Sequence, residues 1–221
     1  YYVGGFIGEL SSGNVENCTI TGGSVSAAGT ADYAGGFLGH SSGVGSSYIT
    51  DCSVSLDGIT AYQIAGGFAG ESYALTIDKC FAEISYVNFT YTNYDGVMMT
   101  FGGLIGKAYN GSVASCSSNF GGISCYGGYA YDSSCGLGGL IGYCSSTTVS
   151  DCRMEDNGIM YSFYTPDYYS VGGLIGSCGE NTIVEDCSVD VDFSNLQSNS
   201  SIKIGGIIGG GSYDSSISIS R

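Results

Sequence analysis

Cysteine, histidine and aspartate are the residue types in this chain that could carry out chemistry. The chain has ten cysteines but a single histidine, His40. A serine or cysteine nucleophile needs an adjacent base, and His40 directly follows a glycine-rich motif. We therefore expect His40 to be a turn residue in a variable position, and we predict no catalytic residue.

Three aspartates, Asp51, Asp151 and Asp186, each precede a cysteine. A row of carboxylates could cleave glycosides or bind calcium, but it is also what a solvated edge of a repeat protein would show. The sequence contains no calcium-loop motif. The Cys-x2-Cys spacing of zinc sites is absent, as is iron–sulfur spacing. The sequence therefore predicts no metal site and no cofactor.

These residues belong to a repeating pattern that decides how they are positioned. A Gly-Gly-Φ-Φ-Gly pentapeptide, in which Φ is apolar, recurs seven times with its first glycine 31 to 36 residues after the previous one. The copies start at Gly4, Gly35, Gly66, Gly102, Gly138, Gly172 and Gly205. Repeats of this length indicate a stacked architecture.

Each repeat contains further strand-like segments after the pentapeptide. Polar and apolar residues alternate around a cysteine, as in Val15 to Ile20 and Ile183 to Val189, which is typical of a half-buried strand. A variable, often aromatic segment follows. We predict about three short strands per repeat, with the motif glycines supplying positive φ and close packing. The chain is thus predicted to be one all-β domain, 1–221, a β-solenoid of about seven stacked repeats with an outward insertion at about 117–134.

The recurring Gly-Gly-Leu-Ile-Gly segment, followed by a cysteine-bearing strand, resembles the GLUG-motif repeats. The resemblance covers essentially the whole chain. It implies a large bacterial or archaeal surface or secreted protein, such as an adhesin. It carries over no catalytic residue, because the motif has none.

Stacking predicts which cysteines meet. Cys144 and Cys178 both lie six residues after a first glycine, so they stand one above the other at about 4.7–4.9 Å, a separation that a disulfide accepts. We predict that bond, and a Cys125–Cys135 bond within the insertion. Six cysteines share a later repeat position, and two interpretations stay open for them. They pair as Cys18–Cys52, Cys80–Cys116 and Cys152–Cys187, or they form a ladder of free thiols.

Composition and charge narrow the classes of partner. The net charge is −15 and only 11% of residues are charged, so nucleic acid and anionic membranes are poor partners. No apolar stretch is long enough for a spanning helix. Disulfides favour an extracellular, cell-surface location. Four glycosylation sequons, at Asn17, Asn88, Asn110 and Asn199, give weak support.

Three functions remain open from sequence. The leading hypothesis is a non-catalytic structural protein that self-assembles by β stacking into a layer, sheath or filament, reinforced by disulfides and tyrosine contacts. Its partner is then another copy or neighbouring repeats of a larger surface protein. An adhesin stalk or binding module for a host protein or glycan is the alternative, and a carbohydrate-active β-helix enzyme is a remote third. The chain begins at a motif without a polar cap, so we expect a fragment or a self-stacking subunit.

Overall fold

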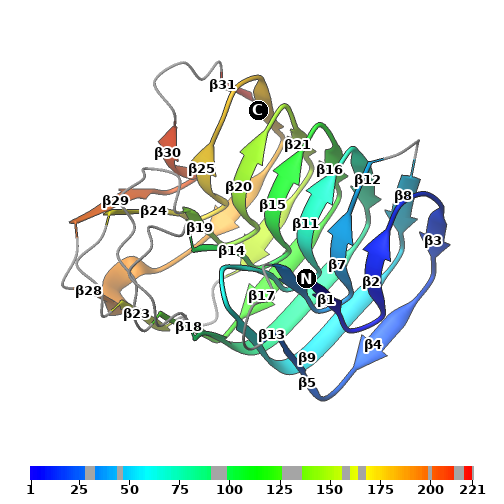
Figure 1. Ribbon diagram of the computed structural model, residues 1–221. Coiled ribbons are helices and arrows are strands. Elements are labelled where there is room, and N and C mark those ends of the chain that lie inside the picture. Colours follow the sequence, from blue (N-terminus) through cyan, green and yellow to red (C-terminus); the bar gives the residue numbers. More distant parts are fainter. Residues whose placement is uncertain are drawn as a thin grey trace.

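The computed structural model describes residues 1–27, 33–43, 47–90, 99–125, 136–155, 160–163, 168–198, 201–211 and 217–220. Most of these residues lie in short strands that build four parallel sheets along one stack (Figure 1). We call one passage through the sheets a rung and number the rungs 1 to 7 by their first motif glycine. The predicted all-β solenoid of about seven stacked repeats is confirmed.

Three of the sheets have seven strands each among the described residues. Sheet A contains β1 (Tyr2–Gly4), β6 (Tyr33–Gly35), β10 (Ile64–Gly66), β14 (Thr100–Gly102), β19 (Gly136–Gly138), β24 (Tyr168–Gly172) and β29 (Ser201–Gly205). Sheet B contains β2 (Ile7–Leu10), β7 (Leu38–Ser41), β11 (Ala69–Tyr73), β15 (Ile105–Tyr109), β20 (Ile141–Ser145), β25 (Ile175–Cys178) and β30 (Ile208–Gly211). Sheet C contains β3 (Asn14–Glu16), β8 (Ser47–Thr50), β12 (Leu75–Asp78), β16 (Ser112–Ala114), β21 (Thr148–Ser150), β26 (Thr182–Glu185) and β31 (Ile217–Ser220).

The fourth sheet, D, is continuous in the middle rungs and divided elsewhere. The long strands β9 (Ser53–Ala61) and β13 (Phe81–Phe89) each pair with two shorter strands of a neighbouring rung. The divided rungs contribute β4 (Thr19–Thr21), β5 (Ser24–Ser26), β17 (Ser117–Phe120), β18 (Gly122–Cys125), β22 (Arg153–Glu155), β23 (Met160–Phe163), β27 (Ser188–Asp190) and β28 (Leu196–Ser198), with a 3-10 turn, η1 (Phe193–Asn195), before β28.

Two details of the predicted repeat are wrong. Rungs 1 to 6 have strands in four sheets rather than about three, because the chain bends inside the pentapeptide and passes from sheet A to sheet B. Residues 117–125, predicted to belong to the outward insertion, form β17 and β18 within sheet D; residues 126–135 lie outside the described part.

The motif glycines are required by close backbone approach and not by positive φ. A Cβ added at Gly4 would lie well inside 3.0 Å of the carbonyl oxygen of Ile7, and one at Gly36 would be equally close to the carbonyl oxygen of Gly67 in the next rung. None of the motif glycines has a positive φ in the left-handed range. A side chain at the first two motif glycines of rungs 1 to 6 has no space, which explains why glycine recurs at these positions.

Among the described residues, positive φ occurs outside the motif, on four glycines and, at two corners of the rung, on residues other than glycine. The corner between sheets C and D holds residues with φ of 50 to 55° in six successive rungs, and the backbone N–H there donates to the next rung, as from Asp51 to the carbonyl of Asp78 at 3.2 Å. Asparagine and aspartate tolerate this conformation better than most side chains. These corner residues are Asn17, Asp51, Lys79, Ser115, Asp151 and Asp186.

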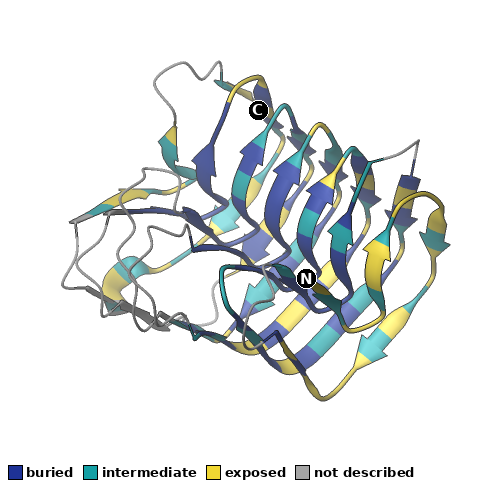
Figure 2. Ribbon diagram, viewed as in Figure 1, coloured by how far each residue is buried: buried dark blue, intermediate teal, exposed yellow. Residues whose placement is uncertain are grey.

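The core consists of columns, in which residues at one register position stack from rung to rung. Phe37 and Phe68 are fully buried, with their rings stacked at 4.7 Å and an interplanar angle of 6°, and Phe6 packs on Phe37 at 5.0 Å. Figure 2 shows buried residues through the middle rungs and more exposed residues on the first and last ones. No helix of the described residues is long and apolar enough to cross a membrane.

Candidate functional site

The three aspartates singled out in the sequence are corner residues. Asp51, Asp151 and Asp186 are exposed and share one column, but Asp51 is three rungs from Asp151, about 14 Å at the usual strand spacing. Asp151 and Asp186 are in adjacent rungs. The same column holds Lys79 and Ser115, so the common requirement is the left-handed backbone and not a carboxylate.

The position after each motif forms a column of alternating charge in sheet B. Register pairs Glu9 with His40, His40 with Glu71, and Glu71 with Lys107. We call these four residues the charged column. No two carboxylates are register partners in this column, because His40 stands between Glu9 and Glu71, and Lys107 follows Glu71. The column therefore avoids the repulsion between like charges that stand directly opposite each other.

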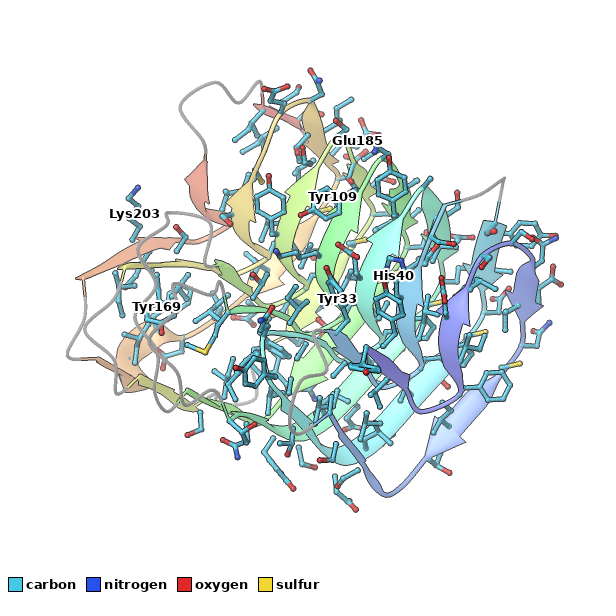
Figure 3. All side chains as sticks on the ribbon, viewed as in Figure 1. Tyr33, His40, Tyr109, Tyr169, Glu185 and Lys203 are labelled. Atoms are coloured by element: carbon cyan, nitrogen blue, oxygen red, sulfur yellow. The ribbon has the colours of Figure 1, made fainter. Side chains whose placement is uncertain are left out.

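His40 is therefore not the turn residue that the sequence suggested, because it lies within strand β7. Its Nδ1 is 2.9 Å from Oε2 of Glu71, and both side chains are largely buried, 13% and 14% exposed. Its ring stacks on Tyr2 with centroids 4.2 Å apart, and Tyr33 lies 5.7 Å away. Figure 3 shows His40 and Tyr33 side by side. This imidazole is packed into the wall of the solenoid.

Burial changes the electrostatics of the charged column toward the middle of the stack. Glu9 is exposed, whereas Lys107 is only 7% exposed. Removal from water raises the pKa of Glu71, and the neighbouring His40 and Lys107 oppose that rise. The column thus links three successive rungs through partly buried charges.

Tyrosines continue along the same sheet. Tyr73 lies 6.4 Å from Tyr109, and Tyr109 lies 5.6 Å from Tyr143, measured between ring centroids. Burial raises the pKa of Tyr109 and of Tyr143, so both remain neutral phenols at physiological pH. We call these three residues the tyrosine row; Tyr109 is labelled in Figure 3.

The six repeat-position cysteines form a second column, which we call the cysteine column. Each thiol donates to the carbonyl two residues earlier in its own rung, for example Cys116 to Ala114 at 3.0 Å. Every second one also accepts from the preceding rung, as from the backbone N–H of Cys80 to Sγ of Cys116 at 3.3 Å. All six are present as thiols. Burial raises the pKa of Cys52 to about 11.

The other predicted pair is brought together by the stack. Cys144 and Cys178 are register partners, and their Sγ atoms lie 3.5 Å apart. Both are present as thiols, and the disulfide remains a prediction. For Cys125 only the backbone is described, in β18, and Cys135 lies outside the described residues.

The glycosylation candidates occupy different environments. Asn17 and Asn110 are exposed at left-handed corners. Asn88 lies within β13 with its Oδ1 buried and without a hydrogen-bond partner in the described part, and Asn199 lies outside that part. Glycosylation at these positions remains a prediction.

The described residues show no catalytic signal. They contain no group of three or more His, Cys, Asp or Glu side chains placed to hold a metal ion. Glu9, His40, Glu71 and Lys107 each stand five residues after a first motif glycine, but the sequence did not reveal their pairing. The tyrosine row was also missed, since Tyr73 and Tyr109 share one register position whereas Tyr143 is offset by two residues.

Comparison with known proteins gives one positive finding. The family model described as "The GLUG motif" matches residues 1–26, which contain the first pentapeptide and the first cysteine strand. A search of curated proteins finds no match. The Gly-Gly-Φ-Φ-Gly pentapeptide of that segment recurs in register through seven rungs, so the chain is a β-solenoid whose first repeat is similar to the GLUG motif.

Proposed function

We propose that the chain is a non-catalytic, extracellular structural protein that extends a cell-surface layer, sheath or filament by end-to-end β stacking. Its partner is a second copy of itself. The observation that carries the proposal is that the first and last rungs each leave the outer edge of their strands without a partner strand among the described residues. In sheets A, B and C these are β1, β2 and β3 at one end and β29, β30 and β31 at the other.

Residues of core columns are exposed at both of these edges. Phe6, at the end of the phenylalanine column, is 57% exposed. At the other edge Ile204 and Ile219 are 52% and 55% exposed, although the residues below them, Val171 and Val184, are buried. Exposed apolar strand edges are templates for pairing with another chain.

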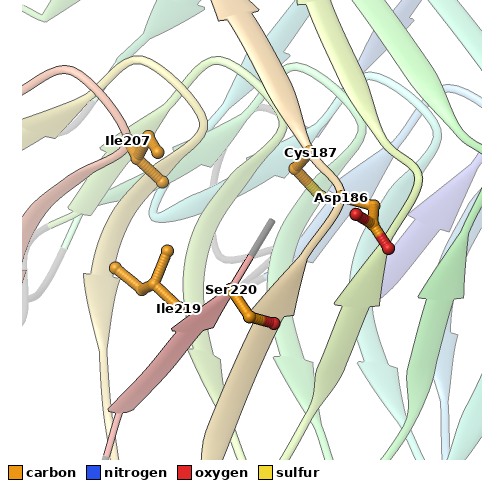
Figure 4. A pocket seen from close by; sticks show the side chains of 5 residues that line it. All are labelled: Asp186, Cys187, Ile207, Ile219 and Ser220. Carbon is orange, nitrogen blue, oxygen red and sulfur yellow. The ribbon is translucent and has the colours of Figure 1, made fainter.

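A hollow opens at the last rung beside these isoleucines. Its lining consists of Asp186, Cys187, Ile207, Ile219 and Ser220 (Figure 4). At this place sheets B and C have a strand in rung 7, β30 and β31, whereas sheet D ends with β27 of rung 6 among the described residues. Further chain packed against this end would cover apolar residues whose counterparts in the rungs below are buried.

The motif supplies a specific test of end stacking. In rungs 1 to 6, a Cβ on the second motif glycine would collide with the carbonyl oxygen of the same glycine in the next rung, whereas Gly206 in rung 7 has open space around it. We therefore expect Gly206→Ala to leave the fold intact but to block a copy from stacking there. The equivalent Gly103→Ala, inside the stack, destabilises the fold itself.

The experiment is negative-stain electron microscopy of the purified chain, with and without reductant, for the wild type and for Gly206→Ala. The expected result is regular polymers from the wild type and single short rods from Gly206→Ala at unchanged circular dichroism. Tyr86→Ser is a matched control on the side of the stack, since Tyr86 is 50% exposed in β13. Short rods from the wild type at all concentrations would contradict self-assembly.

The tyrosine row favours a second candidate, an adhesin stalk that binds a host protein or glycan. Tyrosine combines an apolar ring with a polar tip and is enriched at interfaces, and Tyr73 is 43% exposed. This candidate predicts discrete rods with a ligand whose binding is lost in Tyr73→Ala. Retained binding in that variant would remove the tyrosine row from consideration.

A further inference from the structure

Cys144 and Cys178 are the only thiols in their column among the described residues. The register places Ala108 on one side of the pair and Gly211 on the other, with Ser72 beyond Ala108. Each of the two sulfurs therefore has a single sulfur neighbour, in the adjacent rung. This arrangement differs from the cysteine column, where an inner thiol has a neighbour on both sides.

The two sulfurs of this pair also lack the backbone partner that holds the thiols of the cysteine column. In the described part, the Cys144 thiol contacts only Sγ of Cys178, at 3.5 Å, and Oγ1 of Thr182, at 3.9 Å. The exposed fractions of Cys144 and Cys178 are 0% and 1%. Formation of a disulfide removes the hydrogens of both thiols. For this buried pair, that change costs no hydrogen bond to a carbonyl group.

The six thiols of the cysteine column would lose such bonds. Cys52, Cys80 and Cys152 donate to Thr50, Asp78 and Ser150 in their own rungs at 3.1 to 3.2 Å. A disulfide sulfur has no hydrogen to donate, so oxidation would remove this bond and leave each carbonyl with the hydrogen bond from a backbone N–H of the preceding rung. Oxidation of the cysteine column therefore loses hydrogen bonds to carbonyls that the Cys144–Cys178 pair does not have.

We propose that Cys144 and Cys178 form a single disulfide that joins rungs 5 and 6, while the six cysteines of the cysteine column stay reduced. The bond is a covalent link between successive rungs, placed where sheet B passes from β20 to β25. It does not depend on end-to-end assembly, because both sulfurs belong to one chain and lie inside the stack.

The chemistry balances with a small-molecule disulfide, such as oxidised glutathione, as the oxidant. The thiolate of one cysteine attacks this disulfide and releases one thiolate, which takes a proton; the thiolate of the other cysteine then attacks the mixed disulfide and releases the second. Two protein thiols are oxidised and one small disulfide is reduced to two thiols. The adjacent Cys178 sulfur and burial raise the pKa of Cys144 well above its usual range, so the exchange takes place before rungs 5 and 6 close.

The test is to refold the reduced chain in a mixture of oxidised and reduced glutathione. The product is alkylated in denaturant without reductant, digested and mapped by mass spectrometry. In a chain that carries Cys125→Ser and Cys135→Ser, we expect one cross-linked peptide pair containing Cys144 and Cys178, and alkylated Cys18, Cys52, Cys80, Cys116, Cys152 and Cys187. Alkylated Cys144 and Cys178, or cross-links within the cysteine column, would overturn the proposal.

A thermal measurement provides a second readout. A disulfide that closes a loop of this length stabilises the fold, so its reduction should lower the melting temperature by roughly 6–16 °C. The same Cys125→Ser, Cys135→Ser chain is used, so that those two thiols do not contribute. The Cys144→Ser, Cys178→Ser double variant should melt at the same temperature with and without reductant; an equal reductant effect in that variant would contradict the assignment.

Discussion

Replacing Phe68 with alanine tests whether the core is a set of continuous columns. Phe68 is fully buried, and its ring stacks on Phe37 at 4.7 Å. A buried Phe→Ala substitution costs about 3–5 kcal/mol, through lost transfer energy and the cavity that remains. For a chain of this size, that corresponds to a fall in melting temperature of roughly 6–20 °C.

The same motif position provides two matched controls. Phe6 is 57% exposed, so less than half of the roughly 1.5–3 kcal/mol of a buried phenylalanine is at stake, and Phe6→Ala should cost about 1 kcal/mol. Phe68→Leu reproduces the residue that rungs 4 to 6 carry as Leu104, Leu140 and Leu174, and should cost less than about 1.5 kcal/mol.

The assay is thermal and urea unfolding followed by circular dichroism, at a protein concentration where the chain is monomeric. We expect the order of stability loss to be Phe68→Ala, then Phe68→Leu and Phe6→Ala well below it. If Phe68→Ala and Phe6→Ala cost the same within about 0.5 kcal/mol, which is the precision of such comparisons, the phenylalanine column does not exist as described.

Two further predictions concern the corners and the charged column. Ala74 has a φ of 51°, so Ala74→Gly relieves about 1–2 kcal/mol of backbone strain but costs about 0.5–1 kcal/mol in the conformational entropy of glycine. A urea titration should therefore show that the free energy of unfolding rises by about 0.5–1 kcal/mol. A decrease would show that the corner is unstrained. Glu71 has a raised pKa in the folded chain, so the folded state binds its proton more tightly than the unfolded state does. The stability of the wild type relative to Glu71→Gln should therefore be greatest below the usual glutamate range and fall as pH rises through the raised value; a urea series across pH that shows this difference constant or rising would contradict it.

Much of the architecture could be predicted, because the repeat determines which residues of successive rungs lie one above the other. In a parallel, in-register stack, residues at equal offsets from the first motif glycine occupy one column. Cys144 and Cys178 lie at the same offset, and the structure makes them register partners. The offset of His40 likewise matched those of Glu71 and Lys107, although its identification as a turn residue was wrong.

The path of the chain within a rung was harder to predict. The motif looked like a strand with a flanking turn, yet the chain bends inside it, between sheets A and B. The reason lies in contacts between backbones of different rungs, as where a Cβ at Gly36 would meet Gly67. Such contacts have no signature in local alternation, which is the pattern from which strands are predicted.

The sequence by itself determined the number of rungs, their register and the residues that share each column, because constant spacing leaves little freedom in a parallel stack. Only the tertiary structure decided which columns face one another. The ring of Tyr2 covers His40 across two sheets. The thiol of Cys116 donates to a carbonyl in its own rung, whereas the thiol of Cys144 has no carbonyl partner among the described residues. These differences depend on the angles at which each rung turns its corners, and those angles follow from packing between rungs.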